Sequence, residues 1–303
     1  MAKIIDAHVH TGVWLGTRYN LEKLEAIMQK PLLNGDTVEK MVVSNMFCNI
    51  RDENTDEFTG NTELLDIVGS RPQFLPLAVC QPRKGSVSKI RELFNENPGR
   101  FAGLKFHPDH QALVASDEKY EPYLAFAQEN GLPCLFHCGI AWEGYALVEE
   151  SRRHSSAEAI YQIARKFPRV PVVLAHLGAG GPVVHEKTVS VLLESLEKKD
   201  AKLYTDISWV DWETKEKATI VELVKKLKER NALDRLLFGT DAPIGEFETL
   251  KENGGWRLYS AVVADIKNAI KNDTNPAFDV ADIIHKVFYQ NAQKLFEKKL
   301  LAK

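Results

Sequence analysis

Side chains that bind metal ions gather at the ends of short apolar segments in this chain. Five of the nine histidines and one aspartate stand at such ends: His8, His10, His107, His137, His176 and Asp241. Imidazole nitrogens and carboxylate oxygens are donors that Zn²⁺, Mn²⁺ and Fe²⁺ accept without any thiolate. These residue types therefore predict a metal site built from nitrogen and oxygen.

The spacing of these residues supports a shared site. His8 and His10 are separated by one residue, and alternate residues of a strand point to the same side, so both imidazoles can face one ion. Asp241 follows a fully apolar segment, where a buried carboxylate is unfavourable unless it is paired or binds a cation. In isolation, His137 and His176 would each be interpreted as structural histidines. They are candidate metal ligands because they occur together with the other residues of this set.

Eight apolar segments rich in β-branched and aromatic residues recur along the chain, at 3–10, 40–46, 73–80, 101–107, 132–138, 170–176, 202–208 and 236–241. Amphipathic stretches with helical spacing lie between them, for example at 117–130, 155–167, 183–199 and 214–230. Successive segments end about 27 to 39 residues apart, which fits one βα unit each. This pattern predicts an α/β protein with a (β/α)8 TIM barrel, completed by helices at 256–271 and 280–300.

An open, doubly wound sheet is the main alternative fold. It usually has fewer strands and a GxGxxG turn after the first one, whereas the first segment here ends in HVHTG. The glycines at 178–181 lack the P-loop pattern and are interpreted as a turn. We expect one domain over 1–303, with nothing before the barrel. In such a barrel the active site lies at the C-terminal ends of the strands, where the histidines stand.

Composition excludes several classes of protein. The 303 residues are 44% hydrophobic and 27% charged, which is ordinary for a globular chain. A net charge of −3 argues against nucleic acid or an anionic membrane as a partner. No apolar run approaches the roughly 20 residues of a membrane span, and no secretory signal is present. The four scattered cysteines form no CxxC, so we expect reduced thiols in a cytoplasmic protein, with Cys138 packed toward the helices.

The segments DAHVH, LKFHP, LFHCG, LAHLG and FGTDAP, in this order, resemble the amidohydrolase superfamily. The resemblance is closest to its amidohydrolase-2 branch of metal-dependent barrel hydrolases and related decarboxylases. The later segment YQNAQKLF resembles the C-terminal helix signature of that branch. The whole resemblance spans Asp6 to Phe296. The resemblance implies that His8, His10, His137 and Asp241 hold the metal. It further implies that His176 binds a second metal or positions water and substrate.

Lys105 decides how many ions the resemblance implies. Binuclear members of the superfamily carry a carbamylated lysine at the end of the fourth strand, where it bridges two metals. A single metal is commoner in the amidohydrolase-2 branch, and Lys105 would then contact substrate or form an ion pair across the barrel mouth. His107 shares its face and is a candidate for substrate binding or for a structural role beside Pro108. We expect one ion, Zn²⁺ first, with Mn²⁺ or Fe²⁺ as alternatives.

The predicted activity is hydrolysis of an amide, ester or lactone-type bond in a small molecule by metal-activated water. A bound divalent ion lowers the pKa of water from 15.7 to about 7. Asp241 would accept the proton, and His176 would polarise a carbonyl or orient the water. Barrels of this size often pair, which makes a homodimer a candidate assembly.

Two alternatives stay open. In a non-oxidative decarboxylase or other lyase the metal would chelate a carboxylated substrate, and Arg51 could bind that carboxylate bidentately. For a single arginine, however, a surface side chain paired with Asp52 or Glu53 is the favoured interpretation. Trp142 and Trp209 could line an aromatic pocket or cap the barrel. The other alternative is a non-catalytic metal-binding protein. Such a relative would usually lose Asp241 or one of the paired histidines, and none is missing.

Overall fold

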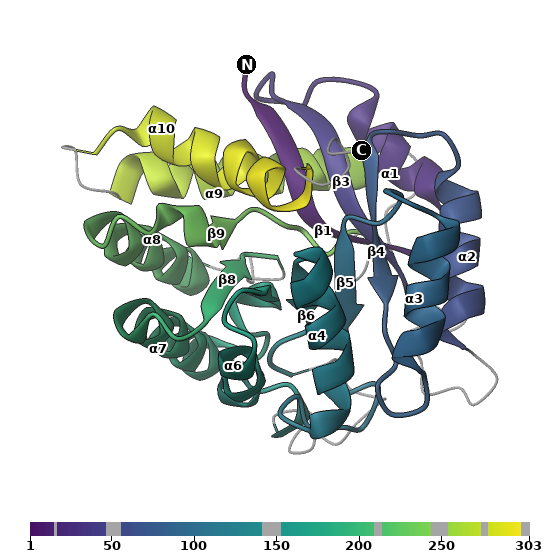
Figure 1. Ribbon diagram of the computed structural model, residues 1–303. Coiled ribbons are helices and arrows are strands. Elements are labelled where there is room, and N and C mark those ends of the chain that lie inside the picture. The colour runs from purple at the N-terminus through teal and green to yellow at the C-terminus, as the bar shows by residue number, and fades with distance from the viewer. Residues whose placement is uncertain are drawn as a thin grey trace.

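Strands occupy the centre of the molecule and helices surround them (Figure 1). The computed structural model describes residues 1–14, 17–46, 56–140, 153–208, 214–243, 254–273 and 278–297. The strands in this part of the chain are β1 (Lys3–Trp14), β2 (Thr17–Tyr19), β3 (Thr37–Asn45), β4 (Phe74–Val79), β5 (Gly103–Phe106), β6 (Cys134–Phe136), β7 (Pro171–Leu174), β8 (Lys202–Asp206) and β9 (Leu236–Leu237). They form one sheet in the order β2-β1-β3-β4-β5-β6-β7-β8-β9.

Helices alternate with the strands as the sequence pattern predicts. The α-helices of the described residues are α1 (Leu21–Met28), α2 (Glu57–Val68), α3 (Val87–Glu96), α4 (Glu121–Asn130), α6 (Ala157–Lys166), α7 (Pro182–Lys198), α8 (Thr214–Glu229), α9 (Gly254–Asp273) and α10 (Val280–His285). Several begin at a side-chain cap, as at Ser156, whose side chain accepts a hydrogen bond from the Ala159 amide. No helix in these ranges is both long and apolar enough to cross a bilayer.

Each of the eight predicted segments overlaps a strand, and these eight strands run parallel. Two differences arise at the first strand. β2 was not predicted. β1 is longer than predicted and continues to Trp14, because its residues from Gly12 onward pair antiparallel with β2. The curled sheet is consistent with the predicted TIM barrel.

The helical stretch predicted over 280–300 is helical over residues 280–297, the part that the structure describes. After α10 the backbone continues in two short π-helical segments, η6 (Lys286–Gln290) and η7 (Gln293–Glu297). Ala292 and Phe296 from this region pack against apolar residues of the strands, including Ile5 and Leu77. This region therefore packs against the inner residues of the sheet, and α9 fills the position between α8 and α1.

The strands have two apolar faces. One face packs against the helices and includes Ile4, Val9 and Phe106, while the other forms a smaller inner cluster that includes Ile5 and Ala7. Cys138 belongs to the helix-facing cluster, as its position next to His137 predicted. Burial raises the pKa of its thiol to about 12, so Cys138 is a packing residue.

The first and last strands of the parallel set meet at a seam, formed by β1 and residues 238–242. The Ala7 amide donates to the Phe238 carbonyl at 2.9 Å, and the Asp241 amide donates to the His8 carbonyl at 2.8 Å. Val9 and Ala242 form a parallel bridge. The seam therefore places Asp241 beside the two histidines of β1.

Asp6 holds the two sides of the seam together. Its fully buried carboxylate accepts hydrogen bonds from the His8 amide at 3.1 Å, from the Thr240 amide at 3.1 Å and from the Thr240 hydroxyl at 2.6 Å. The Tyr259 hydroxyl of α9 donates to the same carboxylate at 2.9 Å. One side chain thus joins β1, the segment that carries Asp241, and the covering helix.

Candidate metal centre

A β-bulge turns His8 and His10 toward the inside of the sheet. Asp6 pairs with Met41 and Val9 with Val43, so β1 has one more residue than β3 across this step. Ile5 and Ala7 face the inner cluster, so strict alternation along β1 would place Val9 on the inner face as well. Because of the bulge, Val9 packs against the helices instead. Both imidazoles then share the inner face, as the His-x-His spacing predicted.

His8, His10 and Asp241 form a buried group of metal-binding side chains. His10 Nε2 lies 2.9 Å from Asp241 Oδ1, and His8 Nε2 lies 3.4 Å from the same oxygen. The exposed fractions of His8, His10 and Asp241 are 1%, 3% and 6%, respectively. Asp241 has a left-handed backbone with φ 63°, which turns its side chain away from the strand direction. One nitrogen of each imidazole and one carboxylate oxygen thus face the same small volume.

His137 and His176 lie next to this group. His137 Nδ1 and His176 Nε2 are 3.1 Å apart, and the ring centroids of His176 and His8 are 4.8 Å apart. His137 directly follows β6, whereas His176 lies in the turn η3 (Ala175–Leu177) beyond β7 and has a left-handed φ of 63°. All five predicted ligands therefore lie close together in one buried group. This group is called the donor cluster and consists of His8, His10, His137, His176 and Asp241.

Gly139 permits the two loops that carry His137 and His176 to approach each other. Its φ is +97°, and a Cβ atom at this position would lie 2.1 Å from the Ala179 carbonyl oxygen. No other residue type fits such an approach without moving the backbone. Gly139 is thus required for close packing beside the donor cluster.

Hydrogen bonds on the outer side of the cluster hold one nitrogen of each ring, so that the other nitrogen faces the inside of the cluster. His8 Nδ1 lies 3.2 Å from Asp206 Oδ2, and His176 Nδ1 lies 2.8 Å from Ser208 Oγ. His10 Nδ1 lies 2.8 Å from the hydroxyl of Ser44. Metal-binding histidines typically use their second nitrogen in this way, which fixes the ring and directs the other nitrogen to the metal.

The protonation of the cluster also suits a cation. Burial lowers the pKa of all four imidazoles, most strongly for His8 and His137, which leaves their nitrogen lone pairs available. Burial alone would raise the pKa of Asp241, but the nearby histidines lower it well below its usual range. Neutral imidazoles and an ionised carboxylate are the forms that bind divalent ions.

His137 carries a buried nitrogen that an ion would explain. Within the described residues, its Nε2 atom has no hydrogen-bond partner and lies 3.8 Å from Asp109 Oδ2. With Nδ1 bound to a cation, Nε2 would carry the proton and face that carboxylate. The residues present therefore fit a divalent ion, which His8, His10, His137, His176 and Asp241 would hold.

Lys105 joins the donor cluster from β5. Its side chain is fully buried, and Nζ lies 2.9 Å from His8 Nε2. Burial lowers its pKa to about 8, against the opposite effect of the Asp241 and Asp206 carboxylates. This placement agrees with the predicted position at the site and is compatible with either a substrate contact or a carbamylated lysine.

His107 stacks beside His137, a member of the donor cluster. The ring of His107 lies between those of His110 and His137, with centroids 3.5 and 4.1 Å away and interplanar angles of 12° and 8°. Its Nδ1 is hydrogen-bonded to Asp109. Donor atoms of His107, Asp109 and His137 lie within 4.8 Å of one another, so this stack is a further candidate group that shares His137 with the donor cluster. Because its carboxylate is hydrogen-bonded to Nδ1 of His107, we interpret Asp109 as a residue that orients His107.

Three predicted substrate-binding residues, Arg51, Trp142 and Trp209, lie outside the described residues. Conversely, sequence reasoning missed Ser44, Asp206 and Ser208. Each stands at or just after the C-terminal end of a parallel strand, and that position is the only signal that could have identified them. Serine and aspartate are common there, so the signal alone would not separate them from turn residues.

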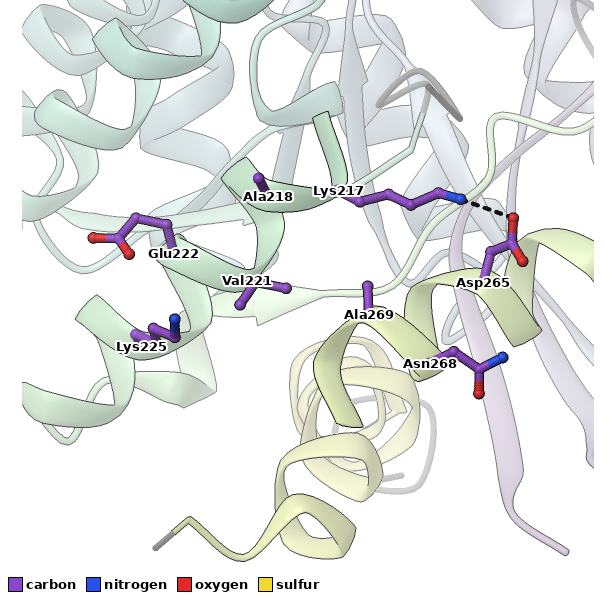
Figure 2. Close-up of a pocket in the computed structure, with 8 residues that line it drawn as sticks. All are labelled: Lys217, Ala218, Val221, Glu222, Lys225, Asp265, Asn268 and Ala269. Atoms are coloured by element: carbon purple, nitrogen blue, oxygen red, sulfur yellow. Dashed lines mark hydrogen bonds and ion pairs between the residues drawn. The ribbon is translucent and has the colours of Figure 1, made fainter. Parts of the chain in front are cut away.

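A groove lies on the outside of the molecule, between α8 and α9 (Figure 2). Its volume is about 560 Å³, and the ion pair between Lys217 and Asp265, at 2.9 Å, lies along it. None of the eight residues that line it belongs to the donor cluster. This groove is therefore not the predicted site.

Comparison with known proteins connects this geometry to a family. The model of the amidohydrolase-2 family, described as Amidohydrolase, matches residues 5–298. No curated protein matches the sequence significantly. Several solved structures share the fold over nearly their whole length.

One such structure is a probable 2-pyrone-4,6-dicarboxylic acid hydrolase from Acinetobacter baumannii, with 13% identity, a TM-score of 0.65, and coverage of 97% of this chain and 99% of that chain. A TIM-barrel protein from Bordetella bronchiseptica has 16% identity, a TM-score of 0.63, and coverage of 97% and 98%. A 5-carboxyvanillate decarboxylase from Novosphingobium aromaticivorans, complexed with manganese, has 12% identity, a TM-score of 0.64, and coverage of 98% and 96%. At these identities the likeness concerns the fold.

Proposed function

Because this chain belongs to the amidohydrolase-2 family, we propose that it is a metal-dependent hydrolase of small molecules. It would hydrolyse an amide, ester or lactone-type bond. The observation that carries the proposal is the donor cluster, in which Nε2 of His8 and of His10 lie 3.4 and 2.9 Å from one oxygen of Asp241. We place this site at the C-terminal ends of the strands of a complete (β/α)8 barrel.

We propose one Zn²⁺ ion, with Mn²⁺ or Fe²⁺ as alternatives, since all three accept imidazole and carboxylate ligands. The charge of the site favours a cation. Two buried carboxylates, Asp206 and Asp241, face one buried ammonium, Lys105. When bound, the ion would lower the pKa of a coordinated water to about 7 and polarise a carbonyl oxygen.

The protein's own residues would move the proton and orient the substrate. Asp241 is ionised, and its carboxylate borders the nitrogens of His8 and His10, where it can accept a proton and later return it to the leaving group. His176 is held by Asp206 and Ser208, and its Nε2 faces the cluster, where it can orient the carbonyl or the attacking water. Burial of the cluster excludes bulk water from this step.

A non-oxidative decarboxylase is the second candidate, and Lys105 is the observation that favours it. A fully buried ammonium beside the donor cluster is suited to a substrate carboxylate, because a buried charge requires a partner. His107, held by Asp109, would border the same substrate. The 5-carboxyvanillate decarboxylase shares this fold.

A product assay separates the candidates. Zinc- and manganese-loaded protein is incubated with two panels, one of lactones, esters and amides and one of carboxylated aromatics. We expect a new carboxylic acid from the first panel and no CO₂ from the second. Release of CO₂ would favour the decarboxylase, and no turnover of either panel by fully metal-loaded protein would favour a non-catalytic metal-binding protein. We further propose a single domain over 1–303 and a homodimer.

A further inference from the structure

The hydroxyl of Ser208 lies between two histidines of the donor cluster and one carboxylate. Its Oγ is 2.8 Å from His176 Nδ1 and 3.2 Å from His8 Nδ1, and it donates to Asp206 Oδ1. Ser208 and Asp206 are fully buried. We propose, resting on the function proposed above, that Asp206 and Ser208 are positioning residues that fix the tautomers of His8 and His176, so that Nε2 of each faces the ion.

The hydrogen-bond inventory determines these tautomers. A serine hydroxyl has one proton, and the Ser208 proton goes to Asp206. The Ser208 oxygen can then only accept from the two imidazoles. Asp206 Oδ2, 3.2 Å from His8 Nδ1, likewise only accepts. Both histidines must therefore carry their proton on Nδ1, which leaves the lone pair on Nε2. In this structure that lone pair faces Lys105 Nζ at 2.9 Å in His8 and His137 Nδ1 at 3.1 Å in His176.

Asp206 also fixes the backbone that carries His176. Its Oδ1 accepts from the His176 amide at 3.0 Å and from the Ser208 amide at 3.0 Å. His176 has a left-handed φ of 63°, which is unusual for a residue other than glycine and needs such support. The same carboxylate therefore sets the direction of the His176 ring and the proton of His8.

The same contacts exclude a metal ion between His8, His176 and Asp206. Atoms of these three residues lie within 4.8 Å of one another, which alone would suit an ion. The Ser208 hydroxyl occupies that space, however, and is hydrogen-bonded to all three. The ion belongs on the opposite side of the two rings, toward Asp241.

The two histidines should respond to different substitutions. His176 Nδ1 has the Ser208 hydroxyl as its acceptor, whereas His8 Nδ1 also has Asp206. Ser208→Ala should therefore release the tautomer of His176 and leave that of His8. In Asp206→Asn, the amide oxygen should take the position of Oδ1, where three donors converge, so that the amide nitrogen faces His8. His8 would then carry its proton on Nε2 and lose its ability to bind the ion there.

The test is long-range ¹H–¹⁵N NMR of the metal-free, ¹⁵N-histidine-labelled protein, combined with Zn²⁺ affinity measured by competition with a chelator. We expect Nδ1–H on both histidines in the wild type, a mixture for His176 in Ser208→Ala, and Nε2–H for His8 in Asp206→Asn. Affinity should fall about 10- to 100-fold in both variants. Ser208→Thr should restore it, and Ser195→Ala, which removes a buried hydroxyl on α7, should change neither readout.

Unchanged tautomers, or unchanged Zn²⁺ affinity in both variants, would overturn the inference. If a variant does not fold, the wild-type spectrum still decides, because Nε2–H on His8 or His176 contradicts the proposed network. The metal-free spectrum also separates this inference from the proposed function. Predicted tautomers in a protein that turns over no substrate contradict the function alone.

Discussion

Replacing Asp241 by asparagine is expected to lower turnover about 10²- to 10⁴-fold, the usual contribution of a general acid or base. Asparagine keeps the shape of the side chain and one oxygen that can face His10, which lies 2.9 Å from Asp241. It cannot accept the proton of the attacking water. The effect should therefore appear in kcat as well as in kcat/KM, because the proton moves only during the reaction.

The comparison must be made at equal metal content, since Asp241 is also a proposed ligand. Variant and wild-type protein are loaded to the same measured zinc content before the kinetics. Asp265→Asn is the matched control, because Asp265 pairs with Lys217 on the outside of α9 and should leave turnover unchanged. Wild-type turnover by metal-loaded Asp241→Asn would contradict the role assigned to this carboxylate.

Removing the Asp6 carboxylate is expected to cost about 3 kcal/mol or more of unfolding free energy. Asp6→Ala leaves the Thr240 and His8 amides and the Tyr259 hydroxyl without their acceptor in a fully buried seam. A buried donor left without a partner costs about 1–3 kcal/mol, and such costs are not additive in one network. Because the seam holds Asp241 beside His8, the variant should also bind Zn²⁺ more weakly.

Urea unfolding of the metal-free proteins measures this effect without any contribution from bound zinc. Tyr259→Phe is the control, because it removes one donor and leaves the other three hydrogen bonds of Asp6 in place. We expect it to lose about 1 kcal/mol. A loss of less than 1 kcal/mol for Asp6→Ala would show that the seam does not depend on Asp6.

The sequence was informative about which residues meet, because a parallel sheet brings the C-terminal ends of its strands to one edge. His8, His10, His137, His176 and Asp241 stand after four such segments, and the structure brings them together. Their positions follow from strand periodicity and connection length, which are properties of local sequence. The parallel eight-strand pattern was predicted for the same reason.

Other features depend on contacts between distant residues and were not predicted. The bulge in β1 exists only through its pairing with β3, yet it decides that His8 and His10 face inward. Asp206 and Ser208 act on His8, nearly 200 residues away in sequence, so no local pattern reveals them. β2 similarly depends on its pairing with β1, and the apolar spacing predicted a helical stretch at the C-terminus without its π-helical segments η6 and η7.

The state of Lys105 also lies beyond the sequence. Its strand position fits both a substrate contact and a carbamylated bridge between two ions. The structure shows that its amine is buried next to His8 and that burial lowers its pKa to about 8. A lower pKa increases the fraction of neutral amine, the form that reacts with CO₂. The number of bound ions therefore reports on the state of this residue.

Elemental analysis of the purified protein, before and after saturation with zinc or manganese and desalting, tests the central claim most directly. We predict one equivalent of a divalent transition metal per chain, lost in a variant that combines His8→Ala with His10→Ala. Two equivalents together with a carbamate mass on Lys105 would correct the number of ions while leaving the site in place. A protein that retains neither zinc nor manganese after saturation would contradict the proposal that these side chains form a metal centre.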